Sequence, residues 1–438
     1  MGGASSTPSD GTSPQIARDL RLLLGNFDRL DPMTQRLVSL GKKCLTSTIL
    51  DSQQNNFKRL EEFNAEASGA PLQVPLGGAE AGAEAAGSTA KGSDNFSPVD
   101  FESYPFEDTV GDSKSLSELK TEDSHDLHLE GSSARGMEQD EDAGLFLPLT
   151  QARPIYLGQT YPRWKYMYKL QNMYALCVPT RKIIYIQPID EFPDFMTEFR
   201  ISMKSLSLDV FSLLQGFTQI FFSGLDVTVL PSVSMERMGW TNLVKTRCHK
   251  ETEQKQYRAK DFYPLLKSSL PSDGHCVLGL VWTDLYPEDD LNFTLGEVSF
   301  YHRAGIFCFG RFETKGFNKE THKDITEVDG FLVWKLIRAI SHELCHLFGL
   351  RHCTYFHCSM NESTSLVEAM DQPLFLCPVC LRKLHEVCRF DVLDRYQQML
   401  GFLLELQTQL PSVHCDKAIV WLQNCISFLQ QPASATGN

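Results

Sequence analysis

Long hydrophobic runs are absent from this sequence. No stretch of eighteen or more consecutive apolar residues occurs, and the longest candidate, residues 210–222, is interrupted by Gln215 and Gln219. A helix needs about 20 apolar residues to cross a bilayer, so we expect no transmembrane segment. The first thirteen residues contain neither a basic stretch nor an apolar core, and we therefore expect no secretory signal. Together these absences predict a soluble protein of the cytoplasm or the nucleus.

An excess of basic residues is absent as well. The net charge is −14, and residues 64–147 hold 18 acidic and 4 basic residues, which leaves 37 of each sign elsewhere. Without a basic surface to meet phosphates, we expect no nucleic-acid partner. The same segment has few large apolar side chains and cannot bury enough surface to offset its ordering entropy. We therefore predict a disordered acidic linker over residues 67–150, preceded by a helical N-terminal extension over residues 1–66.

The first six residues, Met-Gly-Gly-Ala-Ser-Ser, fit the loose pattern for N-myristoylation at Gly2. A disordered start rich in glycine and serine is the alternative interpretation. A single acyl chain binds membranes only marginally, and neither a basic cluster nor a nearby cysteine provides a second anchor. We therefore expect at most a weak membrane anchor at Gly2.

The sequence also does not favour a disulfide framework. The chain has 13 cysteines, an odd number, and four of them stand at metal-ligand spacing, which indicates a reducing compartment. These four are Cys353, Cys358, Cys377 and Cys380. They form two pairs about twenty residues apart, which predicts a closed tetrahedral zinc site with a structural role. Four free buried thiols are the alternative, and Cys388 and His357 are spare candidate ligands.

One stretch of the chain reads H-E-x-x-H-x-x-G-x-x-H. Its first two histidines, His342 and His346, are four residues apart and so lie on one face of a helix, one turn apart. That spacing suits two imidazoles that bind one zinc ion, with Glu343 beside them as a base for the water at the metal. Gly349 can leave the helix in a left-handed conformation, which would bring His352 back as a third ligand. Three protein ligands leave one position for water, as in catalytic zinc sites. A solvated helix that happens to carry histidines is the alternative.

The hydrophobic pattern predicts alternating strands and helices between residues 183 and 283. Buried strands are expected at residues 183–189, 225–230 and 276–283, with helices at residues 194–222 and 259–270 between them. Such alternation implies right-handed crossovers and a mainly parallel sheet. Two more strands, residues 292–300 and 305–312, precede a helix over residues 326–350 that carries the histidine motif. Amphipathic helices are expected near both ends of the chain, over residues 14–27, 31–63, 385–410 and 415–429.

The histidine motif and the cysteines behind it resemble those of the archaemetzincins, an archaelysin-type branch of the metzincin zinc metallopeptidases. The resemblance rests on the extended motif, on Cys353 directly after it, and on Met360 and the C-x-x-C knuckle that follow. Shorter stretches, residues 283–287, 292–296 and 305–307, are also similar to that family. The resemblance runs from about residue 183 to the last helix and does not include the first 150 residues.

The resemblance implies an α+β fold of the zincin or metzincin type, with a twisted mixed sheet, long helices and an active-site helix. It implies a catalytic upper subdomain over residues 151–352 and a small zinc-stabilised C-terminal subdomain over residues 353–432. In that family the three histidines bind a catalytic zinc and the four cysteines bind a second zinc, so we expect two Zn²⁺ per chain. Met360 would lie in the tight Met-turn beneath the catalytic metal.

Two hypotheses for the function follow. The first is a zinc-dependent metallopeptidase that hydrolyses peptides or proteins, with Glu343 accepting the proton of a zinc-activated water. The family association suggests aminopeptidase-like action on short peptides, and it makes residues 292–300 the edge strand that pairs with the substrate backbone. The alternative is a zinc-stabilised interaction or scaffold protein with weak or no catalysis, which the acidic linker and N-terminal helices favour. The intact Glu343 favours the enzyme, because a scaffold has no use for a carboxylate there.

Overall fold

The computed structural model describes residues 14–49, 144–149, 158–172, 182–250, 252–310, 326–363, 368–369 and 372–431. The predictions for Gly2, for most of the linker and for the helix beyond residue 49 lie outside these ranges. All described residues belong to one compact unit of the chain. None of their helices is both long enough and sufficiently apolar to cross a membrane. The subdomain boundaries predicted near residues 66, 150 and 352 stay predictions.

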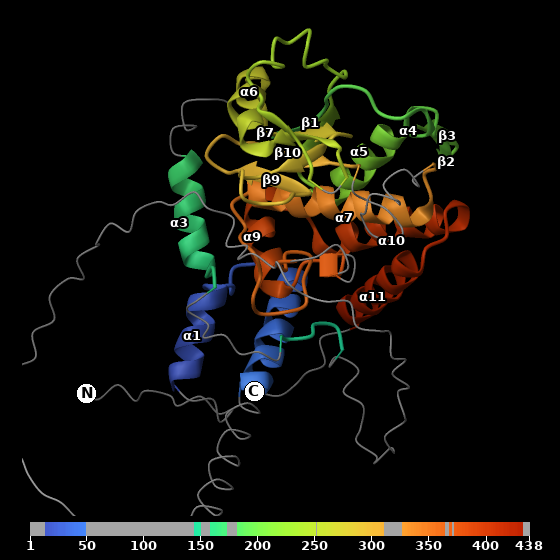
Figure 1. Ribbon diagram of the computed structural model, residues 1–438. Helices are drawn as coiled ribbons and strands as arrows, with labels where there is room; N and C mark the ends of the chain where they lie inside the picture. Colours follow the sequence, from blue (N-terminus) through green and yellow to red (C-terminus); the bar gives the residue numbers. More distant parts are fainter. Residues whose placement is uncertain are drawn as a thin grey trace, which may run out of the picture. The chain divides into compact units, whose positions relative to one another are not determined.

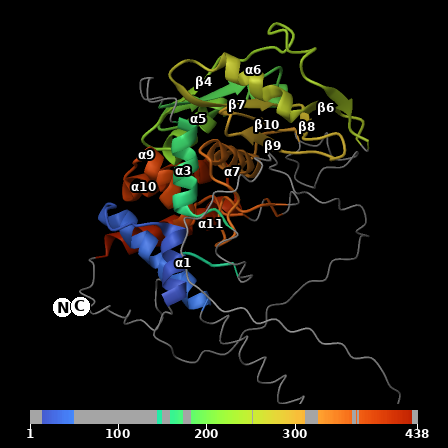
Figure 2. The same cartoon turned by 90° about the vertical axis from the view of Figure 1, so that its left-hand side faces the viewer.

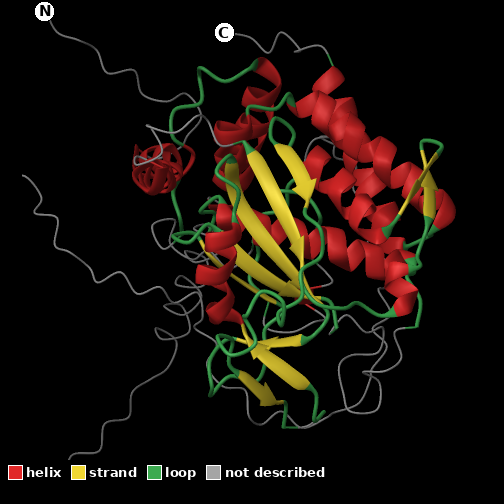
Figure 3. Ribbon diagram, turned by 90° about the horizontal axis from the view of Figure 1, so that it is seen from above, coloured by secondary structure: helices red, strands yellow, loops and turns green. Residues whose placement is uncertain are grey.

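A five-stranded sheet lies at the centre of the described part of the chain (Figure 3). Its strand order is β4-β1-β7-β10-β9, and the first four strands are parallel, whereas β9 runs antiparallel at one edge. The strands are β1 Ile183–Pro188, β4 Asp226–Val229, β7 Gly274–Val281, β9 Gly296–Ser299 and β10 Ala304–Cys308. The predicted α+β fold with a mixed, mainly parallel sheet is confirmed. Short runs of Val, Ile and Leu form such strands because both faces of the sheet are covered.

Helices cover the two faces of this sheet (Figure 1). The short helix α6, Phe262–Ser269, packs on one face against β7 and β10. On the other face lies α7, Gly330–Leu347, which carries the histidine motif and contacts β7, β9 and β10. The helices α5, Val210–Phe221, and α10, Val392–Gln409, pack in the same layer as α7. The helix α7 therefore lies directly beneath β9, the antiparallel edge strand of the sheet.

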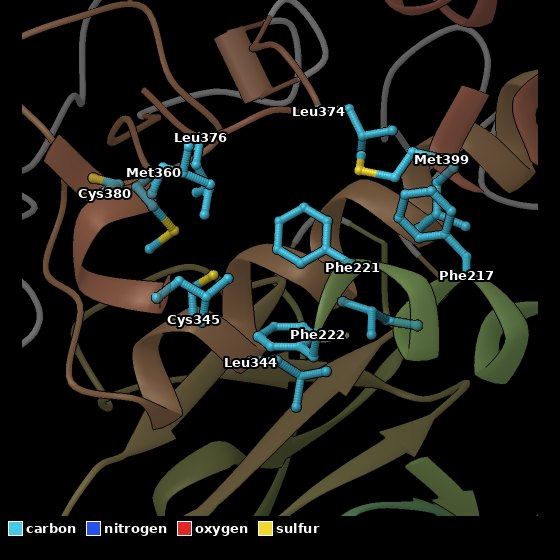
Figure 4. Packing of buried hydrophobic residues seen from close by; sticks show 14 of the residues in the cluster. Phe217, Phe221, Phe222, Leu344, Cys345, Met360, Leu374, Leu376, Cys380 and Met399 are labelled. Carbon is cyan, nitrogen blue, oxygen red and sulfur yellow. The ribbon is translucent and has the colours of Figure 1, made fainter. Parts of the chain in front are cut away.

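Alternate side chains of β7 divide the apolar residues into two cores. Leu278 and Leu280 join the larger core with α5 and α7, whereas Val277 and Val281 join the smaller core under α6. This follows from the two-residue repeat of a strand, which sends successive side chains to opposite faces. Figure 4 shows part of the larger core, where aromatic side chains of the α5 region lie close to Leu344 of α7.

The helix α7 matches the expectation for residues 326–350 apart from its ends. It begins after Asp329, whose side chain accepts a hydrogen bond from the backbone N–H of Leu332 at 2.7 Å and so caps the helix. It ends at Leu347, and Gly349 follows with a φ of 77°. The left-handed conformation predicted for this glycine is confirmed, and it turns the chain back toward the helix.

The prediction of a single helix over residues 194–222 is wrong. The structure has a short helix α4, Asp194–Thr197, then a hairpin of β2, Ile201–Met203, and β3, Leu206–Leu208, and only then α5. Lys204 and Ser205 form the hairpin turn with positive φ values of 48° and 65°. Asp209 then starts α5 as its cap, accepting from the backbone N–H of Ser212 at 2.7 Å. The apolar spacing alone did not reveal these two interruptions.

The prediction of one continuous helix over residues 385–410 is also wrong. The structure has α9, Pro378–Cys388, and α10, which are separated at Arg389. Arg389 is in the left-handed conformation with a φ of 58°, and the side chain of Asp391 caps α10 by accepting from Asp394 at 2.8 Å. The last helix, α11 Val413–Gln430, agrees with the prediction within two residues.

A second, three-stranded sheet was not predicted. It consists of β5 Thr246–Cys248, β6 Lys255–Arg258 and β8 Asp284–Tyr286. Arg247 of β5 stacks on Tyr286, 3.9 Å from the ring centre, and donates to the backbone carbonyls of Asp289 at 2.9 Å and Asn292 at 2.8 Å. These contacts hold the segment that leads into β9, which begins at Gly296 rather than at residue 292. Strands of three or four largely polar residues have too little periodicity to be recognised.

The N-terminal helices pack against the C-terminal part of the chain. The helix α1, Pro14–Leu24, contacts α3, Tyr161–Asn172, and α9 (Figure 2). From the helix over residues 32–49, Arg36 donates to the backbone carbonyls of Phe428 and Leu429, each at 2.8 Å. A guanidinium at the last carbonyls of α11 satisfies acceptors that a helix end leaves without partners.

Candidate metal centres

Three histidines gather at the end of α7. His342 and His346 stand one helical turn apart, and the turn at Gly349 brings His352 opposite them. One ring nitrogen from each histidine lies within 4.8 Å of the others. All three side chains are partly exposed. The spacing of the motif thus brings three imidazoles to one point that solvent can reach.

Backbone carbonyls define the tautomers of the first two histidines. Nδ1 of His342 lies 2.6 Å from the carbonyl oxygen of Ser359, and Nδ1 of His346 lies 2.6 Å from that of Leu350. Because a carbonyl oxygen only accepts, we assign the proton to Nδ1 in both rings, which leaves a lone pair on each Nε2. The two Nε2 atoms face each other at 3.0 Å, and two lone pairs repel at this distance unless a cation lies between them. The donor set therefore fits a zinc ion.

The protein keeps this cluster uncharged. The pKa of His342 is lowered well below its ordinary value and that of His346 to about 3, mainly by desolvation and in part by the adjacent imidazoles. The pKa of His352 is also lowered, again mainly by desolvation. A neutral imidazole is the form that binds a metal, so the cluster is ready for one at neutral pH.

Glu343 places its carboxyl group against the edge strand. A Cβ atom added at Gly296 of β9 would lie only 2.8 Å from Cδ of Glu343, so the strand needs glycine at this position. The pKa of Glu343 is raised to about 8, mainly by desolvation and in part by the carboxyl group of Glu297, whereas the guanidinium of Arg338 opposes both. A carboxyl group with a pKa near neutrality can both accept and return a proton.

The loop after His352 is tied to the histidines by its backbone. Met360 is fully buried, and its carbonyl accepts a hydrogen bond from the N–H of Cys353 at 2.7 Å. The residue before it, Ser359, provides the carbonyl that orients His342. Asn361 closes the loop, because its side-chain amide donates to the carbonyls of Cys353 and Phe356, both at 2.8 Å. The backbone therefore links Met360 to the residues around the cluster, and its place in a Met-turn stays a prediction.

Four cysteines form a second group directly behind the histidines. Cys353, Cys358, Cys377 and Cys380 are all buried, and their sulfur atoms lie within 4.8 Å of one another. Cys353 and Cys377 are 3.6 Å apart at Sγ, much farther than a disulfide bond of about 2.05 Å. The backbone N–H groups of Met360 and Cys377 point at Sγ of Cys358, at 3.5 and 3.3 Å, which suits a thiolate. Such a closed, buried donor set fits a structural zinc ion. Cys388 and His357, the spare candidates, are outside this group.

Sequence reasoning missed a glutamine that holds the turn between His346 and His352. Gln159 donates from Nε2 to the carbonyl of Gly349 at 2.8 Å, and its Oε1 accepts from the N–H of Arg351 at 3.1 Å. The ammonium group of Lys383, on α9, donates to Oε1 and to the backbone carbonyl of Gln159, at 3.0 and 2.6 Å. A contact between residues 190 positions apart leaves no local signal in the sequence.

Comparisons with known proteins agree with this geometry. A family model described as Peptidase family M54 matches residues 290–386, the range that holds the edge strand and both clusters. The chain is 30% identical to archaemetzincin-2 of Homo sapiens over 289 residues, which cover 58% of this chain and 77% of that protein. It is 31% identical to archaemetzincin-1 of Homo sapiens over 263 residues, 55% of this chain and 50% of that protein.

The histidine cluster, its adjacent carboxyl group and the peptidase family match define a zinc metallopeptidase, which is a hydrolase. Within that class, the chain belongs to the archaemetzincin family. A solved archaemetzincin from Methanopyrus kandleri is 19% identical, with a TM-score of 0.34 over 48% of this chain and 97% of that chain. A zinc-dependent peptidase from Methanocorpusculum labreanum is 15% identical, with a TM-score of 0.31 over 46% and 99%.

Proposed function

We propose that the protein hydrolyses peptide bonds at a zinc ion held by His342, His346 and His352. A zinc ion bound by three neutral imidazoles acidifies water and polarises a carbonyl group. The observation that carries the proposal is the position of Glu343, which follows His342 on α7 and whose carboxyl group lies against Gly296 of the antiparallel edge strand. The partial exposure of the three histidines leaves access for water and a substrate.

In this proposal Glu343 is the general base. It takes a proton from the attacking water and returns it to the leaving amine, two tasks that suit a pKa of about 8. Arg338 lies near enough to influence the pKa of Glu343 and favours its ionised form. Gly296 leaves space for the carboxyl group of Glu343 beside the strand. The close contact with Gly296 sets the position of that carboxyl group on one side.

We further propose that β9 binds the substrate backbone. Among the described strands, β9 pairs only with β10, which leaves its outer backbone groups available to an extended peptide. A peptide that adds a strand there would run across the carboxyl group of Glu343. Aminopeptidase-like action on short peptides is the finer part of this proposal, and it draws on the family resemblance. Turnover of the same peptides with free and with acetylated N-termini tests it, and equal rates would contradict it.

The second proposed metal is a structural zinc on Cys353, Cys358, Cys377 and Cys380. Its support is the buried set of converging sulfur atoms and the N–H groups directed at one of them. None of the twelve cysteines among the described residues forms a disulfide bond, which supports a reducing compartment, the cytoplasm or the nucleus. Metal analysis of the purified protein should give two zinc ions per chain, and a count of one or none would contradict the two-site proposal.

Substitution of the proposed base tests the activity. Peptide turnover by the zinc-loaded wild type should fall by at least about 10²-fold in the Glu343→Ala variant, because the carboxylate proposed to accept the proton is removed. The zinc content of both proteins should be the same, because Glu343 is not a ligand. Equal turnover in the two proteins would exclude this mechanism, and no turnover in either would favour the scaffold alternative.

A further inference from the structure

Arg338 is a buried cation next to the proposed active site. It lies on α7, one helical turn before His342, and only 4% of the residue is exposed. Desolvation lowers the pKa of its guanidinium to about 10, so the group keeps its charge at neutral pH. A charged group inside a protein is costly unless an anion and hydrogen bonds compensate it.

The described residues compensate this charge only in part. Nη2 of Arg338 donates to Oε1 of Gln372, a neutral acceptor, and Nε has no hydrogen-bond partner in the described part of the chain. Across the described ranges, no carboxylate forms an ion pair with the guanidinium. Among the described residues, Glu343 is the one acid that influences the pKa of Arg338, and no hydrogen bond joins the two side chains. The guanidinium therefore retains the capacity to bind an anion.

Gln372 holds this guanidinium without neutralising it. Its amide nitrogen donates to the backbone carbonyls of Asn361 and Glu362, at 2.9 and 3.1 Å, in the loop that follows Met360. These two bonds orient Oε1 toward Arg338, so the side chain of Arg338 is fixed in place before any ligand arrives. A fixed cation loses little conformational entropy when it binds an anion.

We propose that Arg338 recognises a carboxylate of the substrate close to the scissile bond. This inference rests on the proposed peptidase function, because the substrate must lie beside Glu343. A guanidinium can form two parallel hydrogen bonds with a carboxylate, which gives both affinity and direction. The carboxylate can belong to an aspartate or glutamate side chain or to the free C-terminus of a short peptide. Arg338 is thus a specificity-determining residue for the proposed reaction.

Peptides that differ only in one charge test this preference. Each position next to the scissile bond is varied between Glu and Gln, and each peptide is made with a free and with an amidated C-terminus. The wild type should cleave one acidic form with a kcat/KM about 10- to 100-fold higher than its neutral partner. The Arg338→Met variant should bring this ratio close to one, and Arg338→Lys should keep part of it. An unchanged ratio in Arg338→Met would overturn the inference, even if its total activity falls.

A second variant provides the anion from within the protein. Gln372→Glu keeps the shape of the side chain and replaces the neutral acceptor at Arg338 with a carboxylate. The preference for the acidic peptide should then fall by about 10-fold or more, because the guanidinium is already neutralised. Preservation of the full preference in this variant would show that the substrate carboxylate binds elsewhere. Gln398→Glu, a change on the exposed side of α10, is the matched control and should leave the ratio as in the wild type.

Binding without turnover separates this inference from the proposed function. The Glu343→Gln variant, loaded with zinc, is titrated with fluorescent acidic and neutral peptides. Tighter binding of the acidic peptide that disappears when Arg338→Met is added supports the inference, even if the wild type cleaves nothing. Equal binding of both peptides contradicts the inference and leaves the peptidase proposal intact.

Discussion

At the scale of single residues, the absence of a side chain is as important as the ligands. Gly349 allows the left-handed turn that returns His352 to the cluster, with a φ of 77°. Gly296 instead makes room, because a Cβ atom there would lie only 2.8 Å from Cδ of Glu343. The sequence pattern of the zinc motif contains the first glycine and not the second.

We predict that Gly296→Ala damages catalysis without removing zinc. The new methyl group would lie 2.8 Å from Cδ of Glu343, so the carboxyl group must shift away from the strand. A displacement of about 1 Å can cost on the order of 10²-fold in kcat, which steady-state kinetics would measure. Gly401→Ala on the exposed face of α10, where nothing lies within 4 Å, is the control and should keep full activity. Wild-type kcat in Gly296→Ala would show that the carboxyl group is free to move.

At the scale of elements, segments far apart in the sequence hold the end of α7. Gln159 bonds the turn at Gly349 and Arg351, and Trp164 of α3 donates from Nε1 to the carbonyl of Phe348 at 3.0 Å. That turn includes Leu350, whose carbonyl orients His346. The segment 158–172 therefore acts on the metal ligands through the backbone, although it carries no ligand itself.

We predict that Gln159→Ala weakens zinc binding at the histidine cluster alone. Loss of bonds that orient ligands typically costs about 10- to 100-fold in metal affinity. In a competition with a chelator, followed by cobalt substitution, the zinc ion at the histidines should be released early. The zinc ion bound by the thiolates should be retained. Gln171→Ala is the matched control, because Gln171 also donates to two carbonyls, those of Phe300 and Tyr301. Identical metal release in the two variants would argue against a specific role for Gln159.

The cysteine cluster is joined directly to the histidines through the backbone. Cys353 directly follows His352, and its N–H donates to the carbonyl of Met360. We predict that Cys377→Ser lowers stability and activity together, because loss of one thiolate releases the loop that carries these residues. Removal of a structural metal ligand typically lowers the free energy of unfolding by about 2–5 kcal/mol, which denaturant titration would measure. Cys415→Ser, a buried thiol of α11 outside the cluster, is the control. Full activity in Cys377→Ser would show that the two sites are independent.

At the scale of the whole molecule, the described N-terminal helices are part of the same compact unit as the site. Arg36 illustrates the connection, because it caps α11 with hydrogen bonds to three carbonyls and lies 4.8 Å from the ring centre of Phe428. We predict that Arg36→Ala lowers the free energy of unfolding by about 1–3 kcal/mol, as measured with urea, and leaves the zinc content unchanged. Arg21→Ala, at an exposed position of α1, is the control and should have almost no effect. Equal stability of the two variants would mean that the cap contributes nothing.

The sequence by itself determined the candidate metal ligands, the strands of the parallel sheet and the family. Ligands that lie one helical turn apart, or in a C-x-x-C knuckle, are encoded by local spacing, and buried strands by short apolar runs. Only the tertiary structure decided that residues 194–222 and 385–410 are interrupted, because left-handed residues such as Arg389 and caps such as Asp391 do not alter the apolar pattern. It also decided the contacts of Gln159, Gly296 and Arg338 around the site. Such contacts join residues separated by tens to hundreds of positions, so no local rule of the chain specifies them.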